Sequence, residues 1–451
     1  MSARSAERLK QALASARETR ACVIGAGVLK DVPALFREQA PGARAAVVAD
    51  GTTFGVAGRE VQEALAAAGL AGAEPCVFDA AGLCAEMAHV ERLEASLRAH
   101  ACVPVAVGSG TINDLTKLAS HRCGRPYLCV ATAASMDGYT AFGASITHEG
   151  NKQTFTCPAP RAVVADLEVL CKAPPAMTAS GYADLMAKVV CGADWILADA
   201  LGLEPVDARA WEIVQGGLRD ALADPAGARK GDRAAIAALT EGLMLGGFAM
   251  QWTRTSRPAS GAEHQFSHLW DMEHHTHLGA APSHGFKVGI ATLFIAALYE
   301  RVLATPFERL DVAGACARWP AWPEAEAQAR ALYAGSDFPE LGVQEACAKY
   351  VDRAGLATQL EALKTGWPII KQRLAAQLLP SGDVKRRLDA AGAPSEPEQI
   401  GITRARLSDS VIRAQHIRRR FTVLDLAVRT GNLEPWLDEL FGRGGRWRCE
   451  A

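Results

Sequence analysis

The first third of the chain alternates short apolar runs with segments of helical periodicity. Five runs lack the polar alternation of a half-exposed strand: ACVIGAG, AAVVAD, PCVFDA, CVPVAVGSG and PYLCVATA, at residues 21–27, 45–50, 75–80, 102–110 and 126–133. Continuous apolar strands are typical of parallel sheets that helices cover on both faces. Segments between them, such as REVQEALAAAGLAG, place apolar residues at helical spacing. The pattern predicts a doubly wound α/β domain over residues 1–172.

Beyond residue 172 the pattern changes to helices. A Pro-rich hinge, CKAPPAMTASG, is followed from Tyr182 onward by segments that nearly all predict helices. Residues 234–252, 288–303 and 412–430 are apolar almost all round, which predicts buried central helices. Residues 381–401 mix turn residues with a short helix and predict a surface connection. We expect an all-helical domain over residues 173–451, with a ligand-binding cleft between the two domains.

Composition narrows the classes of partner. Of the 451 residues, 49% are hydrophobic and 22% are charged, which is typical of a globular protein. The formal net charge is −2, so the charge does not favour nucleic acid or an anionic membrane as a binding partner. The short basic run RRRF (418–421) predicts a solvated helix face. The charged N-terminal segment is no signal peptide, and no apolar run reaches the ~20 residues of a membrane span. We therefore expect a cytoplasmic protein.

The twelve cysteines carry little motif information. No pair has C-x-x-C spacing, which argues against a zinc ribbon or a redox-active dithiol. We expect most of them to be small core side chains in a reducing compartment.

One glycine-containing turn has the pattern of a nucleotide site. In VAVGSGTINDLTK a strand, a turn and a helix follow one another, and Gly108 and Gly110 permit a close backbone approach. The free N–H groups of the new helix could bind a pyrophosphate. The pattern is neither G-x-G-x-x-G nor a Walker motif, so a turn used only for packing is the alternative. Asp50 ends a strand, where it could bind an adenosine ribose or cap the helix that TTFG begins.

Six of the eleven histidines lie in the stretch GAEHQFSHLWDMEHHTHLGAAPSHG, residues 261–285. His264 and His268 are four residues apart, so both lie on one helical face. The adjacent His274 and His275 point to different faces, and with His277 they predict a solvated loop or helix end. The stretch allows a metal site, a catalytic base or a polar helix face.

The motifs GSGTINDLTK and ATAASMDGYTAFGAS resemble the sn-glycerol-1-phosphate dehydrogenase family. RAVVADLEVL, SGYADLMAKVVCGADW, GAEHQFSH, SHGFKVG and HIRRRFTVLDLA extend the resemblance in the same order over most of the chain. The wider group contains glycerol dehydrogenase, iron-dependent alcohol dehydrogenases and dehydroquinate synthase. The resemblance implies an N-terminal dinucleotide-binding domain and a C-terminal helical, metal-binding domain.

The resemblance also implies an active site. Asp184, His264 and His284 would bind one divalent ion. Zinc is the expected ion, and nickel and iron are the alternatives. Lys188 stands where iron-dependent alcohol dehydrogenases have a fourth ligand, so three ligands are expected. The catalytic and substrate-contacting residues would be Asp137, Asp184 and His268. The implied contacts of NAD or NADP are Asp50, Gly108, Ser109, Gly110, Thr111, Ile112, Asp114, Thr132, Ala133, Ala134, Ser135 and Ala141.

The implied reaction is reversible hydride transfer between the nicotinamide and C2 of dihydroxyacetone phosphate, giving sn-glycerol 1-phosphate. A divalent cation would polarise the ketone. The substrate phosphate needs cations, for which Lys152 is the leading candidate and Arg161, Lys287 and His277 are weaker ones. Each could instead be an ordinary surface side chain. Ala141 stands where the family usually has serine, which removes one hydroxyl contact to the cofactor.

Three alternative functions stay open. A dehydrogenase of glycerol or another non-phosphorylated polyol is the nearest, and a dehydroquinate synthase-like lyase with no net redox change is the second. The third is a non-catalytic descendant, against which the joint presence of Asp184, His264, His268 and His284 argues. The family resemblance also implies a homodimer.

Overall fold

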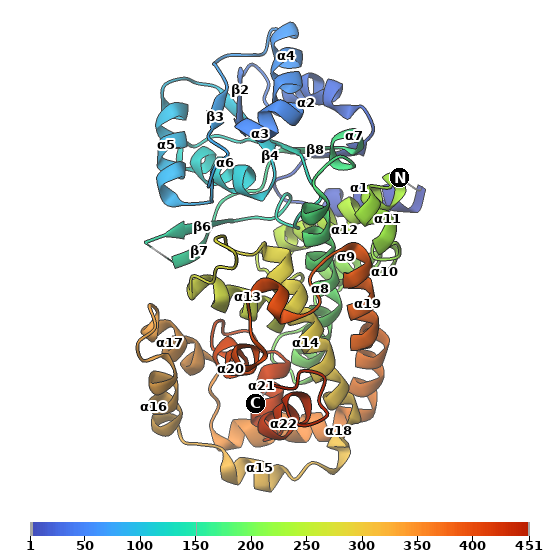
Figure 1. Cartoon of the computed structure of the whole chain (residues 1–451), viewed down its shortest axis with the longest axis vertical. Coiled ribbons are helices and arrows are strands. Elements are labelled where there is room, and N and C mark those ends of the chain that lie inside the picture. The colour runs from blue at the N-terminus through green and yellow to red at the C-terminus, as the bar shows by residue number, and fades with distance from the viewer. Residues whose placement is uncertain (1–2, 150, 450–451) are drawn as a thin grey trace. The chain divides into compact units, whose positions relative to one another are not determined.

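The computed structural model describes residues 3–149 and 151–449 of the chain (Figure 1). Contacts divide it into two compact units. The first contains residues up to Leu185, with 208–258 and 390–392, and the second contains residues 186–207, 259–389 and those from 393 onward. The division falls inside helix α8 (Pro175–Ala200), which is continuous across it. The predicted domain boundary at residues 172 and 173 stays a prediction.

A six-stranded parallel sheet forms the centre of the first unit. Its order is β1-β8-β5-β4-β2-β3, which confirms the predicted α/β class. Each of the five predicted runs contains a strand, and the sixth, β8, comes from RAVVAD. The bounds are β1 (Ala21–Gly25), β2 (Ala45–Asp50), β3 (Cys76–Phe78), β4 (Val103–Gly108), β5 (Leu128–Ala131) and β8 (Ala162–Asp166).

The two faces of this sheet explain the unbroken apolar runs. Alternate strand residues such as Val47 and Val105 pack against Phe36 of α2 (Val32–Gln39) and Val61 of α4 (Arg59–Ala67). The strands are also covered by α6 (Gly110–Arg122), which contacts β4 and β2, and α5 (Met87–Arg98) packs on α6 (Figure 1). Because both faces are buried, neither set of side chains needs to be polar.

The rest of the first unit is a hairpin and a set of helices. The antiparallel hairpin of β6 (Ala144–His148) and β7 (Asn151–Phe155) contacts α6. Helix α12 (Arg233–Thr253) is long and apolar enough to cross a membrane, but 89% of its apolar window is buried, so it is a core helix. The others are α1 (Ala3–Ser15), η1 (Val28–Asp31), α3 (Gly51–Thr53), η2 (Phe54–Gly58), α7 (Leu167–Leu170), α9 (Ala208–Gln215), α10 (Leu218–Ala221) and α11 (Pro225–Lys230).

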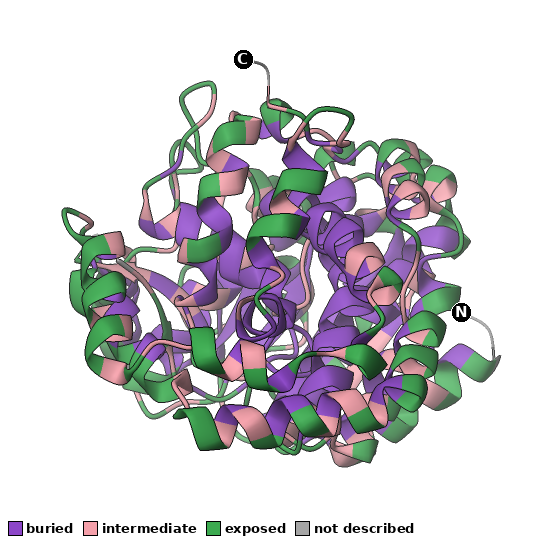
Figure 2. Cartoon of the chain, turned by 90° about the horizontal axis from the view of Figure 1, so that it is seen from below, coloured by how far each residue is buried: buried purple, intermediate pink, exposed green. Residues whose placement is uncertain are grey.

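The second unit is helical, and its described residues contain no strand, which confirms the predicted class. Many of the helices bury one side and expose the other (Figure 2). Their bounds are α13 (Ala262–Met272), α14 (His284–Ala304), η3 (Phe307–Arg309), α15 (Val312–Arg318), α16 (Trp322–Tyr333), α17 (Pro339–Lys349), α18 (Arg353–Gln377), α19 (Ser381–Ala391), η4 (Pro397–Ile400), α20 (Arg404–Gln415), α21 (Val423–Arg429) and α22 (Leu433–Phe441).

The prediction of one helix over residues 412–430 is wrong. Helix α20 ends at Gln415 and α21 begins at Val423. Thr422 starts α21 with a capping box, in which its backbone N–H donates to Asp425 Oδ2 at 2.9 Å. The apolar pattern continues on both sides of this cap, and periodicity alone does not reveal the break.

The cysteines are less buried than expected. All twelve are free thiols, but only four of them are buried, and Cys84 and Cys347 are exposed.

Close packing at Gly181 predicts a specific destabilisation. A Cβ at this position in α8 would lie 1.9 Å from the carbonyl oxygen of Ala134, a backbone atom that cannot move aside cheaply. We expect Gly181→Ala to lower the free energy of unfolding by about 1–3 kcal/mol, although alanine favours helices. Gly366→Ala in α18 is the matched control, because its nearest atom is the flexible Cδ1 of Ile370 at 3.2 Å. Equal urea stability of Gly181→Ala and the unmodified protein would contradict this packing.

Candidate active site

Asp184, His264 and His284 converge in the structure. Their candidate ligand atoms all lie within 4.8 Å of one another. Asp184 lies on α8 and is fully buried, His264 is buried on α13, and His284 is the first residue of α14. One carboxylate oxygen and two imidazole nitrogens suit a catalytic zinc site, which has three protein ligands and an open position. These residues therefore fit the divalent ion that the sequence implies.

A neighbouring carboxylate orients His264. Glu263 Oε1 lies 2.7 Å from His264 Nδ1 and accepts the backbone N–H of Gly261 at 2.7 Å. Burial raises the pKa of Glu263 to about 7, and the Gly261 N–H opposes that shift. An Nδ1–H bond to a carboxylate leaves Nε2 as the ligand atom, which is the usual arrangement around protein-bound metals.

Asp194 fixes the start of the helix that carries His264 and His268. This fully buried carboxylate accepts the backbone N–H of Ala262 at 2.8 Å and of Val423 at 2.8 Å, and the Tyr299 hydroxyl at 2.6 Å. A Cβ at Gly261 would lie 2.5 Å from Asp194 Oδ2, so glycine is required there. No role was predicted for Asp194, although a carboxylate within the apolar sequence of helix α8 is an unusual feature.

The three histidine rings of α13 and α14 form one cluster. The ring centroids of His264 and His284 are 5.2 Å apart, and each lies 6.4 Å from the centroid of His268. His264 and His268 were predicted to lie on one helical face, and the proximity of their rings is consistent with that prediction.

Arg418 contacts His268, a contact that the sequence did not predict. Its guanidinium donates to His268 Nε2 at 2.9 Å. The RRRF run was predicted to be a solvated helix face, and this is wrong for Arg418: the run lies between two helices, Arg418 is half-buried, and burial lowers the pKa of its guanidinium. Since arginine only donates, Nε2 of His268 is an acceptor and the proton of its neutral ring lies on Nδ1.

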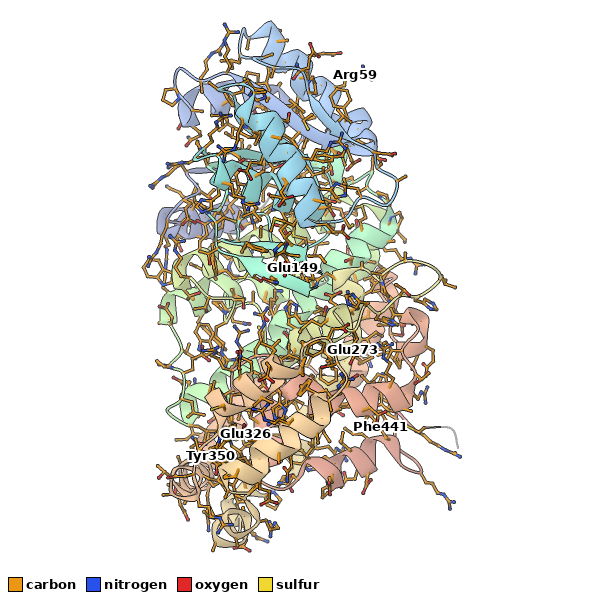
Figure 3. All side chains as sticks on the ribbon, turned by 90° about the vertical axis from the view of Figure 1, so that its left-hand side faces the viewer. Arg59, Glu149, Glu273, Glu326, Tyr350 and Phe441 are labelled. Atoms are coloured by element: carbon orange, nitrogen blue, oxygen red, sulfur yellow. The ribbon has the colours of Figure 1, made fainter. Side chains whose placement is uncertain are left out.

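His275 is a structural residue rather than the solvated one predicted. It is buried, its Nε2 lies 2.6 Å from the Ile400 carbonyl, and its Nδ1 lies 2.8 Å from Arg406. Burial lowers the pKa of His275, which favours the neutral ring that this pair of contacts needs. Arg406 also pairs with Glu273, labelled in Figure 3, at 2.9 Å. His275 therefore joins the loop after α13 to η4 and α20.

The turn after β4 has the geometry of an anion site. Gly108 ends β4 and Gly110 begins α6, whose first residues also include Thr111 and Ile112. A Cβ at Gly108 would lie 2.6 Å from the Cβ of Ile112, so this turn needs glycine. Ser109 does not cap α6 with its side chain, which leaves the first N–H groups open to a phosphate.

Lys117 holds the segment that follows β5. This buried lysine donates to the carbonyls of Gly138 at 3.1 Å, Ala141 at 3.0 Å and Gly143 at 3.0 Å. It was not among the predicted site residues, because the sequence cannot show that its partners are backbone atoms. The predicted cofactor contacts in or beside this segment are Thr132, Ala133, Ala134, Ser135 and Ala141, and all but Ser135 are buried.

The same segment contacts the carboxylate of the predicted metal triad. The backbone N–H of Asp137 donates to Asp184 Oδ2 at 3.0 Å. The Tyr139 hydroxyl donates to the Ala133 carbonyl at 2.7 Å, a hydrogen bond within the same segment. The predicted substrate residue Asp137 is thus adjacent to a predicted metal ligand.

Asp114 and Lys152 lie close to one another in the first unit. Asp114 Oδ2 accepts the Ser145 N–H of β6 at 3.2 Å. Burial raises the pKa of Asp114, and the charges of Lys117 and Lys152 oppose that shift. Lys152 is half-buried on β7. Its proposed contact with a substrate phosphate stays a prediction.

Asp50 caps a helix, which was the alternative left open for it. Its Oδ1 accepts the backbone N–H groups of Thr52 at 2.8 Å and Thr53 at 2.9 Å. Both bonds use Oδ1, and Asp50 is half-buried, so a ribose contact through Oδ2 is compatible with the cap.

The weaker phosphate candidates are placed less favourably. Arg161 immediately precedes β8 and so lies at the amino end of the parallel strands. Gly108 and Thr132 lie at their carboxyl ends. The length of a five-residue strand, roughly 15 Å, separates the two edges of the sheet. Lys287 is buried in an ion pair with Asp271, which already neutralises its charge. His277 packs against Gly401, where a Cβ would lie 2.6 Å from its Nδ1.

Known proteins are similar to this chain in sequence and in fold. A family model for iron-containing alcohol dehydrogenases matches residues 23–174. The glycerol-1-phosphate dehydrogenase (NAD(P)+) of Halalkalibacterium halodurans is 37% identical over 257 residues, 56% of this chain and 64% of that protein. The same enzyme of Bacillus licheniformis is 32% identical over 366 residues, 76% of this chain and 86% of that protein. The chain belongs to the glycerol-1-phosphate dehydrogenase family of the iron-containing alcohol dehydrogenases.

A solved structure confirms the fold of this family member. A probable glycerol dehydrogenase from Sinorhizobium meliloti matches with a TM-score of 0.57 at 18% identity, over 93% of this chain and 97% of that one. The chain spans just under two thirds of the length of the Halalkalibacterium relative.

The contact between Arg418 and His268 predicts a coupled loss of activity. We expect Arg418→Met to lower kcat/KM by roughly 10–100-fold, the usual effect of removing a group that orients an active-site residue. Arg419→Met is the matched control, because Arg419 is exposed and pairs with Glu345 at 2.9 Å.

A double-mutant cycle separates positioning of His268 from a general structural effect. If Arg418 acts through His268, Arg418→Met should cost little further activity in a His268→Asn background. Independent, additive losses would contradict the coupling.

Proposed function

We propose that the protein is a metal-dependent oxidoreductase that transfers hydride between NAD(P)H and dihydroxyacetone phosphate to give sn-glycerol 1-phosphate. The observation that carries the proposal is the convergence of Asp184, His264 and His284, three donors from three helices, within 4.8 Å. The names of the Halalkalibacterium and Bacillus relatives supply the substrate class.

The triad would hold one divalent ion. Zinc is our first choice, and nickel or iron accept the same donors. When bound, the ion supplies Lewis-acid polarisation of the substrate carbonyl. The buried position of Asp184 and His264 supports this role, because exclusion of water strengthens the interaction of a cation with its ligands.

His268 would hydrogen-bond the reacting oxygen. The bond from Arg418 to Nε2 leaves the proton of the neutral ring on Nδ1, so Nδ1–H can donate a hydrogen bond to the C2 oxygen as hydride arrives at C2. The proton that the developing alkoxide takes up would come from solvent. Asp137, whose backbone is bonded to Asp184, would contact a substrate hydroxyl.

The first unit would bind the cofactor and the phosphate. The open N–H groups at the start of α6 suit the pyrophosphate of NAD(P), and Lys117 keeps the segment after β5 in place for the nicotinamide half. Lys152 would pair with the substrate phosphate, next to the cofactor residue Asp114.

A direct assay tests the proposed reaction. Purified protein loaded with zinc should consume reduced nicotinamide, followed by its absorbance, when dihydroxyacetone phosphate is added. We expect His264→Ala or Asp184→Asn to lower kcat/KM by roughly 10³-fold, equivalent to several kcal/mol of transition-state stabilisation. His274→Ala is the matched control, because His274 belongs to the same histidine stretch but is exposed.

The outcomes separate the alternatives. Oxidation of glycerol but no reaction with the phosphorylated substrates would favour the polyol dehydrogenase. No net nicotinamide consumption by protein with bound metal and cofactor would contradict the dehydrogenase and favour the lyase. Chiral analysis of the product distinguishes sn-glycerol 1-phosphate from its enantiomer.

Replacing Lys152 tests phosphate recognition. We expect Lys152→Ala to raise KM for dihydroxyacetone phosphate by about 10–100-fold, because a charge-assisted contact contributes about 1.5–3 kcal/mol, with a smaller effect on kcat. Lys371→Ala, which removes an exposed lysine from α18, should leave both constants unchanged. An unchanged KM in Lys152→Ala would show that another cation binds the phosphate.

A further inference from the structure

A second set of metal-ligand side chains lies in the first unit, separate from the triad. Cys84, Glu86 and His89 offer a sulfur, a carboxylate oxygen and an imidazole nitrogen, all within 4.8 Å of one another. In a tetrahedral zinc site with these donors, the ligand atoms are roughly 3.3–3.6 Å apart. Small side-chain rotations of exposed groups would close the difference, since Cys84 and Glu86 are exposed and His89 is half-buried.

The backbone already holds these three residues in place. Glu86 is the N-cap of α5 and does not use its side chain for capping, and His89 lies in the first turn of that helix. The N–H of Glu86 donates to the Cys84 carbonyl at 2.9 Å. The ring of His89 packs edge-on against Phe78 with centroids 5.8 Å apart. Binding an ion would therefore order the side chains of Cys84 and Glu86 but little further backbone, which lowers its entropic cost.

The segment is also attached to the hairpin that carries Lys152. The N–H of Thr147 in β6 donates to the Ala85 carbonyl at 2.7 Å, and Glu86 forms a parallel bridge with Thr147. Thr147 in turn pairs with Lys152 across the hairpin. An ion at Cys84 would strengthen one attachment of this hairpin.

The donors select a class of ion. Thiolate and imidazole together favour zinc and its neighbours among the transition metals over magnesium or calcium, which prefer oxygen. Partial desolvation of the thiol within this otherwise exposed residue, together with the Glu86 carboxylate, raises the pKa of Cys84 to about 11, so the thiol is protonated near neutral pH. On binding, the sulfur–metal bond replaces the S–H bond and the proton is released to solvent.

We propose that Cys84, Glu86 and His89 form a second metal site, which binds a zinc-type divalent ion with water completing its coordination. The site shares no ligand with the triad of Asp184, His264 and His284, so it can be tested without the proposed reaction.

Cobalt titration of the full-length protein tests this site without an activity assay. A thiolate ligand gives cobalt a charge-transfer band in the near ultraviolet, and the triad of Asp184, His264 and His284 contains no sulfur. We expect the unmodified protein to show this band and to bind about two ions per chain, with zinc or cobalt filling both sites. Cys84→Ser should abolish the band and reduce binding to about one ion, and His89→Ala should weaken the band.

Two further variants make the outcome decisive. Cys347→Ser removes the other exposed thiol and should keep the band. His264→Ala should lose the ion of the triad but also keep the band, so failure of the catalytic proposal and failure of this one are distinguishable. A band that persists in Cys84→Ser, or its absence from the unmodified protein, would overturn the proposal.

Discussion

The burial of the Asp184 carboxylate is the constraint on which the proposed site depends. A buried ionised carboxylate loses several kcal/mol of hydration, which only close and well-oriented partners can offset. Asp184 is fully buried, accepts the N–H of Asp137 and lies with two imidazoles within 4.8 Å. The divalent cation that we propose, shared with His264 and His284, would offset part of this loss.

Helix α8 organises the surroundings of that carboxylate through two acidic residues. Asp184 fixes the segment after β5, while Asp194, further along the same helix, fixes the starts of α13 and α21. The predicted ligand His264 and its neighbour His268 therefore lie on a helix whose first turn is held by a buried hydrogen bond. Glycine is required where α8 meets these elements, at Gly181 against Ala134 and at Gly261 against Asp194. A catalytic constellation needs this kind of support, because small displacements of its members reduce the rate.

Much of the fold and the centre of the site could be predicted from the sequence. Apolar runs identified five of the six parallel strands, because buried strands differ from amphipathic helices in periodicity. The triad followed from the family resemblance, and its members are brought together in the structure. Residues whose role depends on distant partners could not be found in this way. Arg418 had the pattern of a solvated run, and the apolar pattern on both sides of the loop between α20 and α21 concealed the break between these helices. Lys117 and His275 bind backbone carbonyls, and the residue types in a sequence do not identify such partners.

The most direct test of the central claim is anomalous scattering from crystals grown with zinc. We predict an ion bound to a carboxylate oxygen of Asp184 and to one ring nitrogen each of His264 and His284, with His268 beside it and bonded to Arg418. A zinc-saturated crystal in which these three side chains hold no ion would contradict the account, even if zinc were bound elsewhere on the chain.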